Sequence, residues 1–241
     1  MERNMFCPAC GYSRLTHLPV NDPVGDFICD GCGAEFELKS KRTESGHFGH
    51  SIADGAYGSM IERITSRNNP HLFVMLHANW KVDWLQLIPN FLFVPGIIQK
   101  RSALGASARR SGWIGCNILI GDIPESGKIS VVKNGQSRGA DSVLEDFRSV
   151  RSLQTSRIEQ RGWLLDVLKC VEEISSNEFS IEDVYSFADV LARKYPKNRF
   201  VKPKIRQQLQ RLRDRGLLFF RGNGVYEKSE KIASFQLASN Q

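Results

Sequence analysis

The sequence predicts a mixed α/β (α+β) protein of two domains, with a sheet-based domain over residues 1–155 and a helical domain over residues 156–241. Three observations support this prediction. Two Cys-x-x-Cys pairs near the N-terminus have the spacing of a four-cysteine metal site. Short runs of apolar and β-branched residues between positions 36 and 132 are typical of strands. Helical periodicity begins at about residue 162, and a glycine-rich hairpin follows these helices near residue 217.

Composition excludes several classes of protein. The apolar fraction, 41%, is ordinary for a globular chain. No stretch approaches 18 consecutive apolar residues, so we expect no membrane span. The first residues lack the charged-then-apolar order of a signal peptide. We therefore expect a cytoplasmic protein, in which paired cysteines hold metal more often than they form disulfides.

Four of the six cysteines form two pairs that are separated by eighteen residues, the spacing of a zinc site made of four cysteines. The expected ligands are Cys7, Cys10, Cys29 and Cys32. Gly11 and Gly33 follow the pairs, and glycine suits the tight turn that directs two thiolates at one ion. Four thiolates leave no open coordination position, so this zinc should be structural. Cys116 and Cys170 have no near partner and are expected in the core.

Two acidic residues and a lysine lie on the hairpin that contains the second cysteine pair. Glu37-Leu38-Lys39 is the only acidic-x-Lys triplet in the chain. Residues two apart in a strand project from one face, so Glu37 and Lys39 should lie side by side. Asp26 belongs to the partner strand. Two carboxylates beside an ammonium form a hard-cation pocket that can cut a phosphodiester, which makes Asp26, Glu37 and Lys39 the candidate catalytic residues.

The rest of the first domain is expected to surround a small sheet. Periodicity over residues 51–64 predicts a helix, which the Asn-Asn-Pro run after it would stop. Trp80 and Trp84, four residues apart, are expected to pack. Residues 134–160 are interpreted as a linker with a short helix near Val143–Val150. The expected strands are 36–39, 73–76, 85–88, 118–120 and 129–132.

The segment Arg109–Gly115 combines two arginines, two glycines and a tryptophan. This composition lets the backbone approach a phosphate-rich ligand. An exposed indole at Trp113 would stack on a base or hold an apolar group. A buried core tryptophan is the alternative that composition leaves open. Arg109, Arg110 and Trp113 are therefore candidate DNA-contacting residues.

The second domain is expected to contain three helices followed by a hairpin. An apolar stripe over Gly162–Ile174 predicts the first helix, and Ser180 is the expected N-cap of the second. The third helix runs over Lys202–Arg215 and ends at Gly216. A hairpin follows over residues 217–226, with its turn at Gly-Asn-Gly. This order is that of a winged helix, whose third helix normally enters the major groove.

Positive charge is concentrated in this domain. From Arg193 to Lys231, 13 Lys/Arg against 3 Asp/Glu give +10, whereas the whole chain carries +7. A basic segment on a near-neutral body favours a polyanion partner over a solvated basic surface, which remains the alternative. Arginine and lysine suit guanine edges, and glutamine suits adenine. The candidate DNA-contacting residues here are Lys202, Lys204, Arg206, Gln207, Gln210, Arg211 and Arg221.

These motifs together resemble the DpnI-type restriction endonucleases, which cut DNA only when the adenine of GATC is N6-methylated. The resemblance covers nearly the whole chain. Family relatives carry a helical segment before the first cysteine pair, where this sequence has six residues. The matching stretches are Cys7–Gly11, Val24–Phe27, Glu35–Lys41, Asp54–Tyr57, Ala108–Asn117, Arg161–Trp163 and Lys204–Gln210.

The resemblance implies a PD-(D/E)xK nuclease domain and a winged helix that each bind the methylated site. It implies that Asp26 and Glu37 hold Mg²⁺, with the carbonyl of Leu38 as a third ligand. It further implies that Lys39 orients the attacking water and stabilises developing charge, and that Trp113 contacts methyladenine. The implied partner is double-stranded DNA methylated at adenine N6, bound by a monomer without membrane association.

Two other functions fit the sequence. One is a non-catalytic regulator, in which a zinc-ribbon domain is joined to a winged helix; it would bind DNA without Mg²⁺-dependent cutting. The other is an endonuclease with a changed methyl or sequence preference. Winged helices also bind protein partners, but the +10 charge favours nucleic acid.

Overall fold

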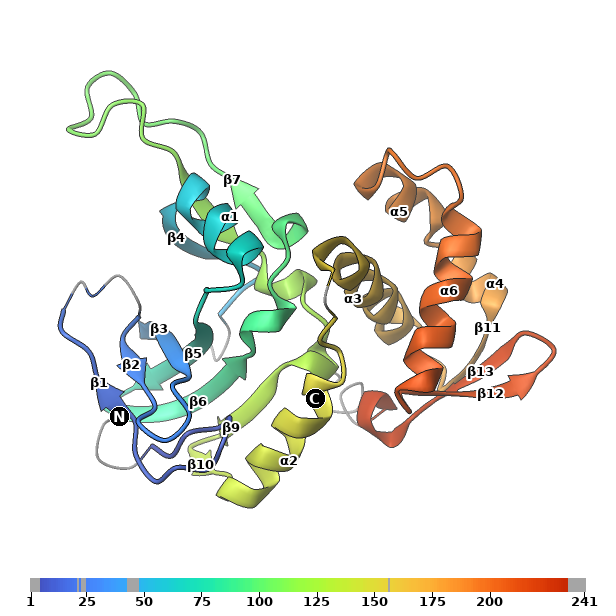
Figure 1. Cartoon of the computed structure of the whole chain (residues 1–241), viewed down its shortest axis with the longest axis horizontal. Coiled ribbons are helices and arrows are strands. Elements are labelled where there is room, and N and C mark those ends of the chain that lie inside the picture. The colour runs from blue at the N-terminus through green and yellow to red at the C-terminus, as the bar shows by residue number, and fades with distance from the viewer. Residues whose placement is uncertain (1–4, 21, 23–24, 43–47, 156, 234–241) are drawn as a thin grey trace. The chain divides into compact units, whose positions relative to one another are not determined.

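The chain divides into two compact units in the computed structural model, which describes residues 5–20, 22, 25–42, 48–155 and 157–233 (Figure 1). Unit 1 comprises Met1–Gly121 and Gly127–Gln154, and unit 2 comprises Asp122–Ser126 and Thr155–Gln241. The predicted mixed α/β class is confirmed. Val24, in one of the matching motifs, lies outside the described residues. Within the described part, no helix has both the length and the apolar character needed to cross a bilayer.

Unit 1 is built on a seven-stranded sheet in the order β1-β2-β3-β5-β6-β9-β10. β3 pairs in parallel with β5, and the other neighbouring pairs are antiparallel. Four of the five expected strands belong to this sheet. Its strands are β1 (Thr16–His17), β2 (Phe27–Ile28), β3 (Glu35–Arg42), β5 (His71–Ala78), β6 (Lys81–Ile88), β9 (Ile129–Lys133) and β10 (Gln136–Ser137).

Aromatic rings form the centre of the unit 1 core. Phe36 of β3 stacks on Phe73 of β5 with 5.1 Å between the ring centroids, and both side chains are fully buried. His71 lies 5.2 Å from the ring of Phe36 and 5.5 Å from the ring of Phe147. This packing fixes β3, the strand that carries Glu37 and Lys39, against its parallel neighbour.

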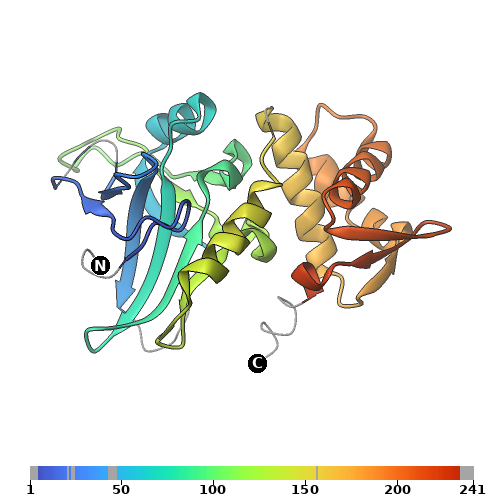
Figure 2. The same ribbon diagram turned by 60° about the horizontal axis from the view of Figure 1, so that its bottom comes forward.

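The short helix expected near Val143–Val150 is confirmed as part of α2, but the interpretation of residues 134–160 as a linker is wrong. Helix α2 (Ala140–Arg151) contacts β9 and lies along the seven-stranded sheet (Figure 2). Its apolar residues Val143, Phe147 and Val150 are buried. The helix is therefore an integral part of unit 1, because its amphipathic face covers the sheet.

A second sheet of unit 1 has three antiparallel strands in the order β4-β8-β7, namely β4 (Ile52–Ala56), β8 (Gly115–Ile118) and β7 (Ile98–Lys100). The helix expected over residues 51–64 is correct only in part, since α1 covers Tyr57–Ser66. The first residues of the predicted range form β4 instead, because Ile52 is buried and the strand pairs with β8. Gly55 lies at a register shift in this ladder, where a residue without a side chain suits the irregular backbone.

Two smaller expectations for unit 1 are also corrected. β8 ends at Ile118, because the next N–H, of Leu119, donates to the carbonyl of Ile97 outside the strand ladder. Trp80 does not pack in the core. It is fully exposed in the β5–β6 turn, where its φ of +63° carries the side chain away from the sheet. Trp84 is half-buried beneath the ammonium group of Lys133.

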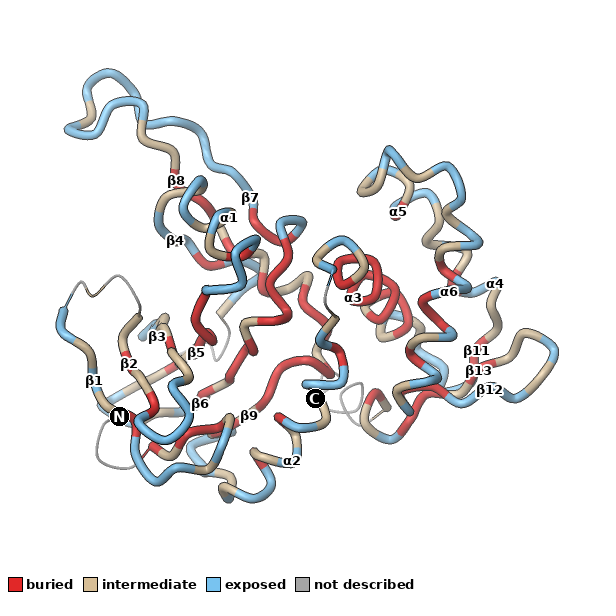
Figure 3. Tube along the Cα trace, in the orientation of Figure 1, coloured by how far each residue is buried: buried red, intermediate tan, exposed pale blue. Residues whose placement is uncertain are grey.

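Unit 2 has the helices and hairpin expected of a winged helix, with one further helix, α5, that was not predicted. Its three-stranded sheet has the order β11-β13-β12. Helix α3 is buried over most of its length (Figure 3), as its apolar residues on several sides require. The elements are α3 (Ile158–Glu173), β11 (Glu178–Ser180), α4 (Ile181–Tyr185), α5 (Ala188–Lys194), α6 (Val201–Asp214), β12 (Leu218–Gly222) and β13 (Val225–Lys228).

Two predicted helix signals in unit 2 are confirmed, whereas the first helix begins at Ile158, four residues before its predicted start at Gly162. Ser180 is the N-cap of α4, where it accepts from the backbone N–H of Asp183 while the Asp183 carboxylate accepts from the N–H of Ser180. Gly216 follows α6 with a φ of +70°, a conformation that side chains disfavour. Ser180 therefore begins α4, and Gly216 ends α6 before the hairpin.

The burial of His71 makes a pH dependence of stability testable. Burial lowers the pKa of His71 from 6.5 to about 4, and its Nδ1 accepts a hydrogen bond from the Asn90 N–H. As pH falls, His71 therefore takes up a proton in the unfolded chain at a higher pH than in the folded protein. We expect the His71 contribution to be complete above pH 6.5 and to decline by about 3 kcal/mol between pH 6.5 and 4. Urea unfolding at pH 7 and pH 5 measures this. His71→Gln should reduce the difference, and an equal loss in both proteins would contradict the prediction.

Candidate functional site

Asp26 is held at the start of β2 by the backbone of β3. Its N–H donates to the carbonyl of Phe36, and its carbonyl accepts from Leu18. Its carboxylate accepts from the N–H of Leu38 at 2.6 Å, the residue between Glu37 and Lys39. The structure therefore brings Asp26 to the same point of the strand as the acidic-x-Lys triplet.

Gly25 permits this close approach of the two strands. A Cβ at position 25 would lie 2.8 Å from the carbonyl oxygen of Phe36, closer than real side chains come to a backbone oxygen. Only a residue without a side chain lets the segment before β2 lie against β3 at this distance. The position of Asp26 thus depends on the residue before it as well as on its own hydrogen bonds.

Glu37 and Lys39 project side by side from β3, as their spacing predicts. The Nζ of Lys39 lies 2.6 Å from an oxygen of Glu37 and 2.8 Å from Oδ1 of Asp54 on β4. Burial lowers the pKa of Lys39, but the hydrogen bonds that its ammonium donates to Asp54 and Glu37 outweigh burial and raise this pKa overall. The amine is therefore held protonated between two carboxylates, each from a different sheet.

Asp54 is the residue of this cluster that sequence reasoning missed. Its side chain is 8% exposed. Oδ1 also accepts from the N–H of Gly55 at 2.8 Å, whereas Oδ2 is buried with no hydrogen-bond partner among the described residues. The available signal was the match of Asp54–Tyr57 to a family motif. Because a helix was expected at this position, the pairing of β4 with β8, which brings Asp54 to Lys39, was not predicted.

The acidic residues suit a hard divalent cation in their chemistry. Mg²⁺ takes oxygen ligands, often only one or two carboxylates, and keeps several waters. Asp26 and Glu37 offer such carboxylates on either side of Leu38, whose carbonyl is a further oxygen donor. Both acidic side chains are half-buried, so they remain open to a metal with its waters. The residues present therefore fit the group that the motif implies.

The four paired cysteines form one compact cluster, as predicted. Cys7 and Cys32 have their sulfurs 3.8 Å apart, and Cys10 and Cys29 have theirs 3.6 Å apart. Four sulfurs at tetrahedral positions about 2.3 Å from a zinc ion are separated by about 3.8 Å. All four sulfurs lie within 4.8 Å of one another, and no other group of three or more His, Cys, Asp or Glu residues among the described residues is this close. The cluster fits Zn²⁺.

Glycine turns shape both halves of the cluster. Gly11 and Gly33 have φ values of +84° and +71°, and their N–H groups donate to the carbonyls of Cys7 and Cys29. Burial raises the pKa of the Cys7 thiol, so a metal must displace the proton from this sulfur. Because Cys29 follows directly on β2, the cluster braces the hairpin that carries Asp26 and Glu37. The two remaining cysteines, Cys116 and Cys170, are buried core residues, as expected.

The segment that joins β7 to β8 is largely exposed (Figure 3) and carries Arg109, Arg110 and Trp113. Both arginines are exposed. Trp113 is half-buried: its ring lies over Gly115, where a Cβ would come within 2.8 Å of it, and the Arg110 guanidinium lies 5.9 Å from its centroid. The indole is therefore neither a core residue nor a free surface residue. The far edge of its ring rests over Gly115, the first residue of β8.

Helix α6 of unit 2 presents the predicted polar face. Arg206, Gln207 and Gln210 are exposed, and Lys204 and Arg211 are half-buried. Opposite them, the stripe of Ile205, Leu209 and Leu212 is fully buried. This division of the helix is that of a recognition helix with one face packed and one face free.

Two further candidate residues of unit 2 have partners within the unit. Lys202 lies over the ring of Tyr185 with its Nζ 4.9 Å from the centroid. Arg221 on β12 forms an ion pair with Glu227 on β13, so its guanidinium would have to exchange this partner to reach a phosphate. Lys202 and Arg221 are thus less available for contact with DNA than the exposed residues of α6.

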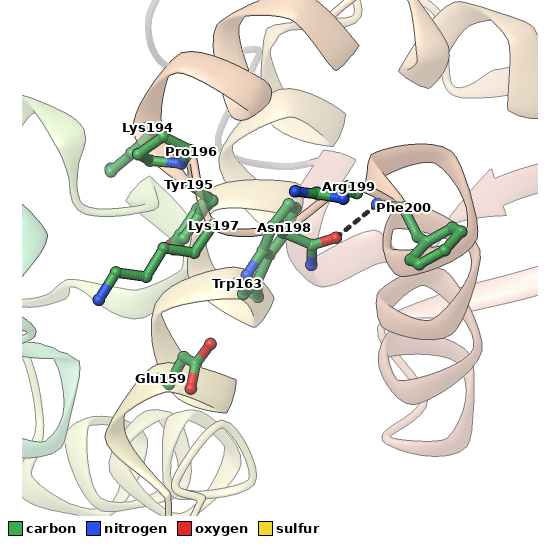
Figure 4. Close-up of a pocket in the computed structure, with 9 residues that line it drawn as sticks. All are labelled: Glu159, Trp163, Lys194, Tyr195, Pro196, Lys197, Asn198, Arg199 and Phe200. Atoms are coloured by element: carbon green, nitrogen blue, oxygen red, sulfur yellow. Dashed lines mark hydrogen bonds between the residues drawn. The ribbon is translucent and has the colours of Figure 1, made fainter.

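A cavity of about 500 Å³ lies beside the start of α6 (Figure 4). Tyr195 stacks on Trp163 at 4.1 Å, and its hydroxyl donates to the buried carboxylate of Asp166. Lys194 donates to the same carboxylate. Lys197 and Arg199, in the loop between α5 and α6, also line this cavity. Sequence reasoning did not single them out because they follow no helical period.

Two protein-family models match the chain, one over each of the two sites described above. The model described as DpnI, Dam-replacing family, matches residues 1–156. The model described as DpnI_C, Dam-replacing HTH domain, matches residues 159–228. The first match contains the cysteine cluster, the acidic-lysine cluster and the arginine-tryptophan segment. The second contains α6 and its hairpin.

Proposed function

Because the chain belongs to the Dam-replacing (DpnI) family, which points to a nuclease with a DNA-binding helix-turn-helix domain, we propose that it is a type II restriction endonuclease. In this proposal it hydrolyses phosphodiester bonds of double-stranded DNA at sites with N6-methyladenine, in the sequence GATC, by a Mg²⁺-dependent reaction. A cytoplasmic location and action as a monomer are part of the same proposal.

One observation carries the catalytic part of the proposal. The carboxylate of Asp26 accepts from the N–H of Leu38, directly between Glu37 and Lys39, while the Lys39 amine contacts Glu37. Two acidic groups and one ammonium thus meet at a single point of β3. This combination supports metal-aided phosphodiester hydrolysis, because few other protein groups are needed for that reaction.

The residues divide the work as follows. Asp26, Glu37 and the carbonyl of Leu38 would hold Mg²⁺, which when bound supplies a Lewis acid and a more acidic water. Lys39 places a positive charge where the attacked phosphate gains negative charge, and it orients the water with its N–H groups. The charge is fixed in advance by the surrounding carboxylates, so little reorganisation is required during the reaction.

Selection of a methylated base requires more than one contact. Burial of one methyl group contributes about 0.8 kcal/mol, which is roughly a fourfold preference. A palindrome modified on both strands offers two methyl groups, and two domains that read it separately multiply the ratio. The N6-methyl group lies in the major groove, the surface that a recognition helix reads. We therefore propose that unit 1 reads methyladenine through Trp113, and that α6 reads the same class of site.

Trp113→Ala should lower the preference for methylated over unmethylated DNA by about fourfold or more, because the indole is the proposed contact of the methyl group. Cleavage rates on paired duplexes that differ only in the methyl groups measure the ratio. Trp113→Phe is the matched control, since it keeps a ring over Gly115 and should retain most of the preference. An unchanged ratio in Trp113→Ala would count decisively against this role.

The overall proposal is tested by incubating the protein with methylated and unmethylated plasmid, each with Mg²⁺ or with EDTA. Cleavage of methylated plasmid only, and only with Mg²⁺, is the expected result. Cleavage irrespective of methylation would indicate an endonuclease with another preference. Sequence-specific binding without cleavage in any condition would instead identify a non-catalytic regulator.

A further inference from the structure

Asp54 has a position in the acidic-lysine cluster that the proposed reaction has not yet used. We infer that Asp54 is the positioning residue that holds the Lys39 ammonium in place when Glu37 is engaged with the divalent cation. This inference rests on the proposed nuclease function and concerns the same site.

The charges around Lys39 show why a second carboxylate is needed. Lys39 Nζ lies 2.6 Å from a Glu37 oxygen and 2.8 Å from Asp54 Oδ1. A Glu37 carboxylate that coordinates a cation shares its negative charge with that cation and attracts the amine less. Asp54 then remains as the anion that fixes the amine. Without it, a long and flexible side chain would be held mainly by an acid that has another task.

The orientation of the Asp54 carboxylate is itself fixed. Oδ1 accepts from the Gly55 N–H at 2.8 Å, and the side chain is 8% exposed. Oδ2 is buried with no hydrogen-bond partner among the described residues. Buried carboxylate oxygens are rarely left unpaired, so this acid is retained at a cost in stability. Lys39 is the cationic group with which it forms an ion pair in the described part of the chain, and that interaction accounts for its retention.

Asp54 acts through Lys39 rather than as a metal ligand. Among the described residues, Asp26, Glu37 and Asp54 do not bring three carboxylate oxygens within 4.8 Å of one another, unlike the four cysteine sulfurs, so Asp54 does not complete a three-carboxylate site with the two proposed ligands. Oδ1 of Asp54 contacts the Lys39 amine instead. The expected consequence is that loss of Asp54 impairs the chemical step and leaves cation affinity nearly unchanged.

The ion pair also joins the two sheets of unit 1. β4 takes its register from β8, with Asp54 opposite Cys116 and Ala56 opposite Gly115. Gly115 is the residue that the Trp113 ring covers. The ladder that sets the position of Asp54 thus begins at Gly115, two residues after the proposed methyl-contacting residue Trp113. Lys39 is placed relative to that residue by way of β4.

The first test replaces Asp54 by Asn, which keeps the shape and removes the charge. Single-turnover cleavage of methylated duplex at saturating Mg²⁺ should fall about a hundredfold, the loss that a misplaced catalytic group produces. KM for DNA and the affinity for Ca²⁺, measured by calorimetry as a non-reactive probe, should stay within about twofold, since Asp54 contacts neither ligand. Glu62→Gln on the exposed side of α1 loses the same charge and should behave as wild type.

A double-mutant cycle tests whether Asp54 acts through Lys39. In a Lys39→Ala background, Asp54→Asn should cost little further activity, because the group that it positions is absent. Asp54→Glu keeps the charge and should recover part of the rate. Circular dichroism and zinc content confirm that each variant is folded, and should Asp54→Asn fold poorly, the Asp54→Glu variant supplies the comparison.

Several results would overturn the inference. Cleavage by Asp54→Asn at the wild-type rate would do so, as would additive losses in the double-mutant cycle. A fall in Ca²⁺ affinity that parallels the fall in rate would make Asp54 a ligand and not a positioning residue. Failure of the wild-type protein to cut methylated DNA would instead overturn the proposed function, so the two failures are distinguishable.

Discussion

Lys39→Ala is expected to reduce Mg²⁺-dependent cleavage of methylated DNA by about a thousandfold while DNA binding survives. The amine is the positive charge proposed to face the phosphate as negative charge develops, and removing one such group typically costs two to three orders of magnitude. Its contacts are with Glu37 and Asp54, not with the hydrophobic core, so the fold should persist. Single-turnover cleavage and a gel-shift measurement in EDTA provide the two values.

Lys81→Ala is the matched control, because it removes the same charge from an exposed position on β6. It should cut and bind as wild type. Asp26→Ala should give a loss similar to that of Lys39→Ala, since it removes a proposed oxygen ligand. Turnover like that of the wild type in either variant would end the nuclease assignment, whereas loss of binding together with cleavage would point to a damaged fold.

Removal of zinc is expected to abolish cleavage even when Mg²⁺ is present. Structural zinc sites contribute about 10–16 kcal/mol, which is comparable to or larger than the stability of a whole domain. The hairpin between Asp26 and Glu37 contains Cys29 and Cys32, so loss of the ion should release both acidic residues together. A chelator that prefers Zn²⁺ to Mg²⁺, followed by circular dichroism, limited proteolysis and a cleavage assay, measures the effect.

Cys170→Ala serves as the control for this prediction, because it removes a thiol outside the cysteine cluster. It should keep its zinc and its cleavage activity. Cys29→Ser should lose both. Full activity after complete removal of zinc, with Mg²⁺ retained, would refute the proposed link between the cysteine cluster and the acidic-lysine cluster.

The part of the site that could be predicted from sequence is the part encoded locally. Glu37 and Lys39 are two residues apart in one strand, and the cysteine pairs repeat one spacing, so each pattern contains its own geometry. The polar face of α6 follows from helical periodicity in the same way. In each case the residues that act together are close in the sequence.

Asp54 illustrates what could not be predicted. It is fifteen residues from Lys39 and belongs to another sheet, so no periodicity connects them. A helix was expected at its position, but pairing of β4 with β8 overrides that local preference. Trp80 failed for a related reason, since spacing alone cannot show that a residue lies in a turn. Long-range strand pairing decided the position of Asp54, and a local two-residue hairpin turn decided that of Trp80.

The closeness of the two cysteine pairs in the sequence also bears on the speed at which unit 1 forms. Only eighteen residues separate the pairs, whereas the parallel contact of β3 with β5 joins Phe36 to His71, thirty-five residues later. Short closures lose less chain entropy and form sooner. The zinc-bound turn would therefore form before β3 pairs with β5. Scarcity of zinc during synthesis would then delay this ladder and leave its apolar strands exposed to aggregation.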